Sequence, residues 1–278
     1  MQPDPAAPAG PAPPPEPEAG ERRGPEVTAG TDADDTMDLY DPAELHAALA
    51  ADGYAGGAGG HAGEYAEEYG ELDAGGDDGT ARTDPQAGDD LLDHVGSWPA
   101  THTPVGRLRL VPVRLPRDLG LIASWMNDPA VAAFWELDGP EERTAEHVRA
   151  QLDGDGRSVP CLGLLDGRPV GYWEIYRADL DPLSRYCPMR PHDTGLHVLL
   201  GRVSDRGRGV GTALLRAVAD LVLDQRPGCA RVLAEPDLRN IPSVAAFLGA
   251  GFRFGAEVDL PDKRAALMVR DRRLRSLL

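Results

Sequence analysis

The spacing of apolar residues predicts a series of helices and strands over the last two-thirds of the chain. Residues 209–225 show the clearest helical period, with apolar side chains recurring every three or four positions. Residues 159–165 and 168–177 are short apolar runs on either side of Asp166-Gly167, which predicts a β-hairpin. The predicted elements, in chain order, are a strand at 107–113, helices at 117–127 and 140–153, strands at 159–165, 168–177 and 195–201, a helix at 209–225, a strand at 230–235, a helix that begins at Asn240 and ends at Gly251, and strands at 252–258 and 264–270. This order is typical of a mixed α/β fold.

The first hundred residues show neither the helical period nor the short apolar runs that predict strands. They contain 23 acidic and three basic side chains, so they carry the entire acidic excess of a 278-residue chain whose net charge is −18. They also contain 12 of the 26 prolines and 16 of the 33 glycines. A segment with few apolar residues and a high net charge cannot bury enough surface to offset the entropy of the free chain. We therefore predict that residues 1–100 are a disordered acidic extension and that residues 101–278 form one folded domain.

Composition also narrows the class of protein. No apolar stretch approaches the roughly 20 residues that a membrane span requires, and the first residues lack the basic and apolar parts of a signal peptide. Cys161, Cys187 and Cys229 form no CxxC pair, which favours a reducing, cytoplasmic setting. The acidic extension and the nearly neutral domain argue against nucleic acid as a partner. We expect a cytoplasmic protein that uses neither a membrane nor a metal ion.

Candidate chemistry is concentrated in the glycine-rich segment Arg206–Gly211, which lies between a predicted strand and the helix at 209–225. Glycines allow the backbone to approach a ligand closely, and the free N–H groups at the start of a helix attract phosphate. Arg206 and Arg208 add positive charge. The segment therefore predicts a cradle for a pyrophosphate.

Two other interpretations of this loop remain open. A dinucleotide-binding fingerprint requires G-x-G-x-x-G, and here the third glycine comes one residue early, although Glu235 supplies an acid at the end of the next strand. The elements before the loop are not repeated βαβ units, which counts against that fold. The loop could also be a glycine turn that binds no ligand.

The spacing Arg206-x-x-Gly209-x-Gly211 resembles the acyl-CoA motif of the GNAT acyltransferases, and the element order resembles that fold over residues 105–271. The resemblance implies an α/β GNAT fold, with a mixed, mostly antiparallel sheet and flanking helices. Further segments resemble the siderophore-biosynthesis branch of the superfamily: Trp125–Pro129, Phe134–Glu136, Gly171–Glu174, Asp193–His197, Glu235–Asn240 and Asp259–Arg264. That branch includes the mycobactin lysine N-acyltransferases and the aerobactin N-hydroxylysine acetyltransferases, and the similarity is greatest to the desferrioxamine N-hydroxycadaverine acyltransferases.

This resemblance implies the transfer of an acyl group from acetyl-CoA or another acyl-CoA to the N-hydroxylated amine of a diamine or lysine, which forms a hydroxamate. It assigns Asp237 as the proton acceptor and His197 as the group that orients the acceptor or polarises the carbonyl, with the reversed roles left open. Trp135, Glu174 and Asp193 are candidates to bind the acceptor, although structural roles fit them equally well. The residues implied in binding acyl-CoA are Arg206, Gly207, Arg208, Gly209, Val210, Gly211 and Asn240. We interpret His147 and His192 as surface or loop histidines.

Other functions fit the same residues. The protein could be a lysine N6-acyltransferase of the mycobactin type, or a GNAT enzyme that acts on another small amine, a peptide or an antibiotic. It could also be a binding or scaffold protein whose domain has lost catalysis. The implied acceptor is a small molecule, and functional association with other siderophore-biosynthesis enzymes is expected.

Overall fold

The protein is described by a computed structural model that covers Tyr65, Leu92 and residues 94–277. The predicted disordered extension lies mostly outside the described residues, since residues 1–64, 66–91 and 93 are not among them.

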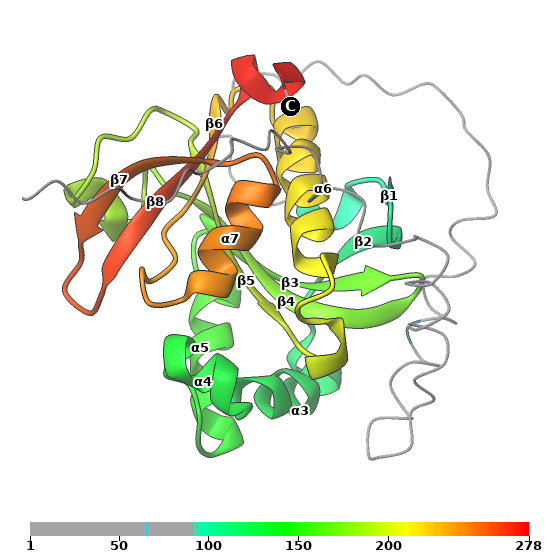
Figure 1. Ribbon diagram of the computed structural model, residues 1–278. Helices are drawn as coiled ribbons and strands as arrows, with labels where there is room; N and C mark the ends of the chain where they lie inside the picture. Colours follow the sequence, from blue (N-terminus) through cyan, green and yellow to red (C-terminus); the bar gives the residue numbers. More distant parts are fainter. Residues whose placement is uncertain (1–64, 66–91, 93, 278) are drawn as a thin grey trace, which may run out of the picture. The chain divides into compact units, whose positions relative to one another are not determined.

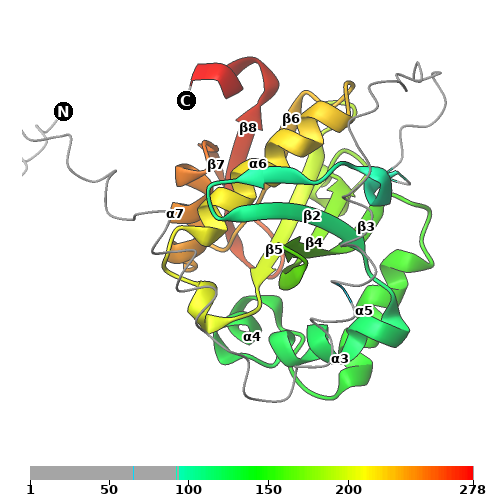
Figure 2. The same cartoon turned by 90° about the vertical axis from the view of Figure 1, so that its right-hand side faces the viewer.

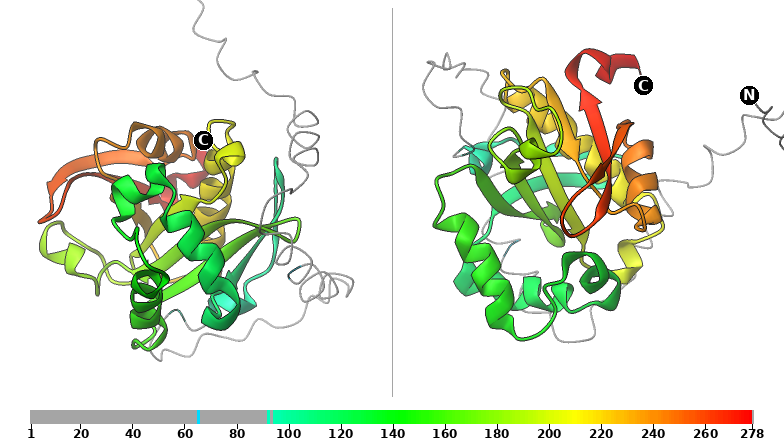
Figure 3. Two further views of the ribbon diagram at one scale, coloured as in Figure 1. Left: turned by 90° about the horizontal axis from the view of Figure 1, so that it is seen from below. Right: turned by 90° about the vertical axis from the view of Figure 1, so that its left-hand side faces the viewer.

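An eight-stranded sheet forms the centre of the domain, in the order β1-β2-β3-β4-β5-β6-β8-β7. The β5–β6 pair is parallel and the other neighbouring strands pair antiparallel, which confirms the predicted mixed, mostly antiparallel sheet. Figure 3 shows the β7–β8 hairpin at one end of the sheet and β1 and β2 at the other. The strands are β1 (Thr101–Thr103), β2 (Gly106–Pro112), β3 (Ser158–Leu165), β4 (Arg168–Arg177), β5 (Thr194–Leu200), β6 (Arg231–Ala234), β7 (Arg253–Asp259) and β8 (Arg264–Asp271).

Helices cover both faces of this sheet. The helices are α3 (Leu115–Met126), α4 (Pro129–Trp135), α5 (Glu141–Leu152), α6 (Val210–Gln225) and α7 (Ile241–Gly249), and the short 3-10 turns are η2 (Val95–Ser97), η3 (Pro182–Arg185), η4 (Val203–Asp205) and η5 (Arg272–Leu277). The apolar stripes of α6 and α7 share one core cluster with the sheet, and those of α3 and α5 share the cluster on the opposite face. Figures 1 and 2 show α6 crossing the sheet and α3, α4 and α5 grouped at its lower end. None of the helices in the described residues has the length and apolar character needed to span a bilayer.

The sequence pattern missed two elements, β1 and α4. The predicted helix at 117–127 ends just before Asp128, and Asp128 begins the next helix, since its Oδ1 atom accepts a hydrogen bond from the Ala130 N–H at 2.9 Å. An Asp at the N-cap followed by Pro at the first helical position is a common way to start a helix. α4 brings Trp135 toward the sheet, so this omission affects the site.

The folded domain begins earlier than residue 101. Tyr65, Leu92, Val95 and Trp98 lie within the predicted extension, yet each is at most 5 % exposed and packs into the core. The Tyr65 hydroxyl donates to Oδ1 of Asp118 at 2.5 Å. These four side chains therefore pack with the domain, although the sequence assigned them to the extension. The reason is that single apolar side chains spaced far apart in an acidic segment give no periodic signal.

Candidate active site

The site lies where β5 and β6 separate. The two strands pair in parallel at only two positions, Thr194↔Val232 and Gly195↔Leu233. His197 and Glu235 each lie two residues beyond the Gly195↔Leu233 pair, so the alternation of side chains along a strand directs both to the same face of the sheet. Glu174 on β4 is paired directly opposite His197 and shares that face. The topology therefore assembles an imidazole and two carboxylates from three strands.

His197 lies between these two carboxylates. Its Nδ1 atom is 2.8 Å from Oε2 of Glu174, and its Nε2 atom is 2.5 Å from Oε1 of Glu235. An ionised carboxylate only accepts hydrogen bonds, so both ring nitrogens must donate and the ring is an imidazolium. Burial alone lowers the pKa of His197, but the charge of Glu235 and the hydrogen bonds to both carboxylates outweigh it and raise the pKa to about 10. The ring is still 37 % exposed.

Glu174 is the more heavily bonded of the two carboxylates. Its Oε1 atom accepts from His147 Nε2 at 2.5 Å, from Gln151 Nε2 at 2.6 Å and from the Tyr172 hydroxyl at 2.9 Å. Burial raises the pKa of Glu174, but the hydrogen bonds from His147 and His197 outweigh it and hold the pKa well below its usual range. A carboxylate with four donors has little capacity left for an acceptor ammonium. Glu174, predicted to bind substrate, is therefore placed to hold His197.

Glu235 completes the network from the other side. Its Oε2 atom accepts from the Tyr176 hydroxyl at 2.8 Å, and Lys263 Nζ lies 3.7 Å from its Oε1 atom. Burial opposes ionisation of Glu235, but the charge of His197 and its hydrogen bond outweigh this and lower the pKa to about 2. The Glu174–His197–Glu235 unit thus carries two negative charges and one positive charge.

A cleft of about 310 Å³ opens over this unit. Trp135 borders it, with its ring edge-on to the His197 ring at a centroid distance of 6.2 Å and to the Tyr172 ring at 5.6 Å. Asp237 and Lys263 also line the cleft. Within the described part of the chain, no group of His, Cys, Asp and Glu side chains is arranged to hold a metal ion.

The sequence-predicted proton acceptor, Asp237, lines the cleft but is bonded to Arg239. Its carboxylate accepts from the Arg239 backbone N–H at 2.7 Å and from the guanidinium Nη2 at 2.6 Å. The hydrogen bond from the Arg239 side chain lowers the pKa of Asp237. Besides Glu174, the carboxylate that contacts His197 is that of Glu235, to which the sequence analysis assigned no catalytic role. The signal that could have found it is the two-residue period of the β6 segment, Leu233 to Glu235.

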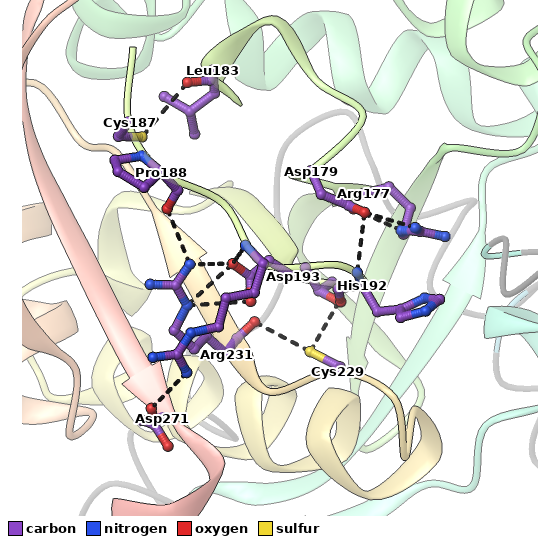
Figure 4. A network of polar contacts seen from close by, with 12 residues as sticks. Arg177, Asp179, Leu183, Cys187, Pro188, His192, Asp193, Cys229, Arg231 and Asp271 are labelled. Carbon is purple, nitrogen blue, oxygen red and sulfur yellow. Dashed lines mark hydrogen bonds and ion pairs between the residues drawn. The ribbon is translucent and has the colours of Figure 1, made fainter. Parts of the chain in front are cut away.

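Asp193 is not among the residues that line the cleft. It is fully buried, where it forms an ion pair with the guanidinium of Arg231 and accepts at 2.7 Å from the Arg190 N–H (Figure 4). These contacts tie the loop before β5 to β6. The structure therefore does not support the prediction that Asp193 binds the acceptor. His147, in contrast, lines the cleft and contacts Glu174, so its interpretation as a surface histidine is corrected.

The predicted pyrophosphate loop leads directly into α6. Gly207 and Gly209 have φ values of 72° and 75°, which L side chains rarely adopt, and a Cβ added at either would meet no atom within 4 Å. The first N–H groups of α6, at Val210 and Gly211, have no partner within the helix because of helix geometry. An open, glycine-lined loop with helix-start amides fits an anionic pyrophosphate. Val210 contributes only its backbone here, since its side chain is buried in the core.

Two residues assigned to the cofactor have other partners. The Arg206 guanidinium donates to the carbonyls of Leu200 and Gly201 and pairs with Asp128 at 3.1 Å. Asn240 caps α7, because its Oδ1 atom accepts from the Ser243 N–H at 3.2 Å, and it also lines the cleft. Among the described residues, no side-chain hydrogen bond or ion pair of this kind involves Arg208, which remains the candidate cation of the loop.

Known proteins with similar sequences are acyltransferases. The chain is 39 % identical over 154 residues to the lysine N-acyltransferase MbtK of Mycolicibacterium paratuberculosis, an alignment that covers 55 % of this chain and 69 % of that protein. It is 36 % identical over 148 residues to the N(6)-hydroxylysine O-acetyltransferase of Escherichia coli, covering 53 % and 47 %. It is 34 % identical over 125 residues to the N-hydroxyputrescine acetyltransferase of Acinetobacter baumannii, covering 45 % and 59 %.

Solved structures share the fold. An uncharacterised protein from Bacillus halodurans superposes with a TM-score of 0.58 at 31 % identity, covering 62 % of this chain and 87 % of that one. The aminoglycoside acetyltransferase AAC(6')-Ib in complex with coenzyme A superposes with a TM-score of 0.56 at 23 % identity, covering 61 % and 98 %. Residues 114–260, more than half of the chain, match the family model described as an acetyltransferase (GNAT) domain. The protein therefore belongs to the GNAT acetyltransferase family and is an N-acyltransferase.

Proposed function

We propose that the protein transfers an acyl group from an acyl-CoA to the nitrogen of a small N-hydroxylated amine and so forms a hydroxamate for siderophore biosynthesis. The names of two relatives support this acceptor class, since they specify hydroxylysine and hydroxyputrescine, whereas the name of the mycobacterial relative specifies lysine. The hydroxamate product binds ferric iron through two oxygens. The acyl-CoA supplies the activated thioester.

The observation that carries the proposal is that both ring nitrogens of His197 are bonded to carboxylates, which leaves no neutral imidazole to act as a base. His197 is already an imidazolium, and Glu174 and Glu235 have lowered pKa values. None of these groups is a strong enough base to deprotonate an alkylammonium, whose pKa is about 10.4. A hydroxylamine nitrogen is far less basic and is neutral near pH 7, so it attacks without prior deprotonation. The site therefore favours an N-hydroxylated amine over a simple one.

Glu235 is the residue we assign to receive the proton. When the nitrogen attacks the thioester carbonyl, a C–N bond forms and the nitrogen becomes acidic, so a weakly basic carboxylate suffices to remove its proton. Glu235 lines the cleft and is held in place by His197 and Tyr176. The C–S bond then breaks, and the thiolate of CoA, whose pKa is near 8.5, takes a proton from water. Glu235 returns its proton to solvent through the cleft.

The other cleft residues position the reactants. The N–H groups of the Gly207–Gly211 loop bind the pyrophosphate, with Arg208 adding charge. Backbone N–H groups near Val198 stabilise the developing negative charge on the carbonyl oxygen, and the imidazolium of His197 holds Glu235 beside the reacting nitrogen. Asp237, fixed by Arg239, attracts the second cation of a diamine or lysine acceptor at the rim.

The decisive assay mixes the purified protein with acetyl-CoA and one acceptor: N-hydroxycadaverine, N6-hydroxylysine or lysine. We expect thiol release with at least one hydroxylated acceptor and a kcat/KM for lysine that is on the order of 10²-fold lower. The product is tested with ferric iron, which gives a coloured complex with a hydroxamate and not with an O-acylated hydroxylamine. Thiol release with none of the three contradicts the proposal, and faster turnover of lysine establishes the mycobactin-type alternative.

A further inference from the structure

Arg206, the first residue of the glycine-rich loop, is bonded inward. Its Nε and Nη2 atoms donate to the Leu200 carbonyl at 3.1 and 2.9 Å, and Nη2 also donates to the Gly201 carbonyl at 3.1 Å. Its Nη1 atom donates to Oδ1 of Asp128 at 3.1 Å. The backbone N–H of Arg206 is bonded to the Val203 carbonyl. The arginine thus ties the donor loop to the end of β5 and to the turn between α3 and α4.

Asp128 connects this arginine to the acceptor cleft. The same Oδ1 atom that pairs with Arg206 accepts from the Ala130 N–H and caps α4. α4 is only seven residues long, and its last two residues, Phe134 and Trp135, both line the cleft. A short helix has few internal hydrogen bonds, so the contacts at its ends determine its position.

Two further contacts make the α3–α4 turn a stiff link. A Cβ added at Gly201 would lie 2.2 Å from Cε2 of Trp125, so the end of β5 packs directly on α3. Asn127 donates to the Gly139 carbonyl at 3.1 Å and accepts from the Gly139 N–H at 2.9 Å. The turn therefore holds both ends of the segment that contains α4.

We propose that Arg206 and Asp128 are positioning residues that couple the acyl-CoA loop to the acceptor cleft. Binding of acyl-CoA fixes the loop, and the ion pair transmits this to α4, which sets Trp135 against His197. The acceptor then binds more tightly to the acyl-CoA complex than to the free protein, and acyl-CoA binds more tightly to the acceptor complex by the same factor. The inference rests on the proposed function for the identity of the acceptor, but not for the coupling itself.

The test uses the full chain with Asp128→Asn, which removes the charge and keeps a side chain that caps helices well. The first readout is hydrogen exchange at residues 130–139, measured with and without coenzyme A. In the native protein we expect coenzyme A to slow this exchange. In the variant we expect the slowing to be lost, with the Kd for coenzyme A changed by less than about 3-fold and the acceptor KM raised about 5- to 10-fold at nearly constant kcat. Asp224→Asn removes a comparable Asp–Arg pair, Asp224–Arg275, away from the loop and serves as the matched control.

Two results overturn the proposal. One is an Asp128→Asn protein in which coenzyme A still slows exchange at residues 130–139. The other is an Arg206→Gln protein that loses coenzyme A affinity on the order of 30-fold or more while that slowing persists at saturation, since Arg206 would then be a phosphate ligand only. If Asp128→Asn does not fold by thermal melting, Arg206→Gln gives the same exchange test from the other partner. Because the exchange readout needs no acceptor, it separates failure of the coupling from failure of the proposed function.

Discussion

The donor and acceptor sides of the protein are built from different materials. On the acceptor side, Glu174, His197 and Glu235 come from three strands and are joined by short charged hydrogen bonds. On the donor side, Gly207 and Gly209 hold an exposed stretch of backbone in a conformation that suits glycine. One side depends on the ionisation of buried groups, and the other depends on backbone geometry and the start of a helix.

This difference predicts how the two sides fail. A change in Glu174, His197 or Glu235 alters which groups hold protons near the reacting atoms, so it lowers kcat. A change in the loop alters how well the backbone N–H groups reach the pyrophosphate, so it raises the KM for acyl-CoA. The following variants test this separation, from the largest expected effect to the smallest.

The largest effect is expected for Glu235→Gln. The amide cannot take up the proton and cannot balance the imidazolium of His197, so we expect kcat to fall about 10²- to 10³-fold with little change in the KM for acyl-CoA. The measurement is steady-state thiol release with a hydroxylated acceptor. Asp237→Asn is the matched variant, for which we expect less than a 10-fold loss of kcat. A larger loss in Asp237→Asn than in Glu235→Gln would show that Asp237 is the proton acceptor, as the motif first indicated.

Glu174→Gln and Asp193→Asn compare the two acidic residues that the sequence assigned to the acceptor. Glu174→Gln removes one charge that holds His197 as an imidazolium, so we expect kcat to fall about 10- to 10²-fold. Asp193→Asn breaks a buried ion pair outside the cleft, so we expect it to lower the free energy of unfolding by about 3 kcal/mol and to leave kcat unchanged. Denaturant unfolding and steady-state rates at low temperature separate the two. A raised acceptor KM in stable Asp193→Asn would contradict the account.

On the donor side, Gly209→Ala forces a side chain into a φ of 75°. The loop must shift to relieve the strain, so we expect the KM for acyl-CoA to rise about 10-fold, with a stability loss of about 1 kcal/mol. Gly251→Ala imposes similar strain at a φ of 87° between α7 and β7, outside the loop. That control should lose stability and keep its KM. Equal KM changes in both variants would show that the loop conformation does not matter for acyl-CoA.

The smallest effect is the pH dependence across the neutral range. The folded pKa of His197 is about 10 against an ordinary 6.5, so its stabilising contribution is complete below pH 6.5 and is lost as the pH rises through about 10. The folded pKa of Glu235 is about 2 against 4.5, so its contribution is present above pH 4.5 and is lost as the pH falls through about 2. We expect kcat to be nearly flat between pH 7 and about 8.5 and to decline as the pH approaches 10, whereas the melting temperature declines steadily from about pH 6.5 to about 10, because only the folded protein holds the His197 proton in that range. A kcat that rises with a midpoint near 6.5 would indicate a neutral His197 acting as a base.

The sequence predicted most of the fold because the evidence for it is local. The period of the α6 segment, the hairpin at Asp166-Gly167 and the glycine loop each depend on neighbouring residues. α4 was missed because its seven residues are too short for a helical period, and Tyr65 because its contact with Asp118 spans 53 positions. The resemblance to the GNAT family then implied that these elements assemble into a mixed, mostly antiparallel sheet with flanking helices, which the structure confirms.

The candidate site was predicted only in part, because its residues meet through tertiary structure. The motif resemblance identified His197 and Glu174. It could not show that the divergence of β5 from β6 brings Glu235 to His197, nor that α5 packs His147 onto Glu174. Asp193 and Arg206 carry the charges that a substrate site needs, but internal partners satisfy them. Charge type is visible in a sequence, whereas the partner of a charge is not.

The central claim is that His197 is an imidazolium held between two carboxylates. It is tested most directly by following the ring nitrogens of His197 by ¹⁵N NMR as the pH rises, with His197→Asn used to assign the signals. The account predicts that both nitrogens stay protonated through neutral pH and titrate near pH 10, and that Glu174→Gln or Glu235→Gln lowers this pKa. Titration of His197 near 6.5 in the native protein would contradict it.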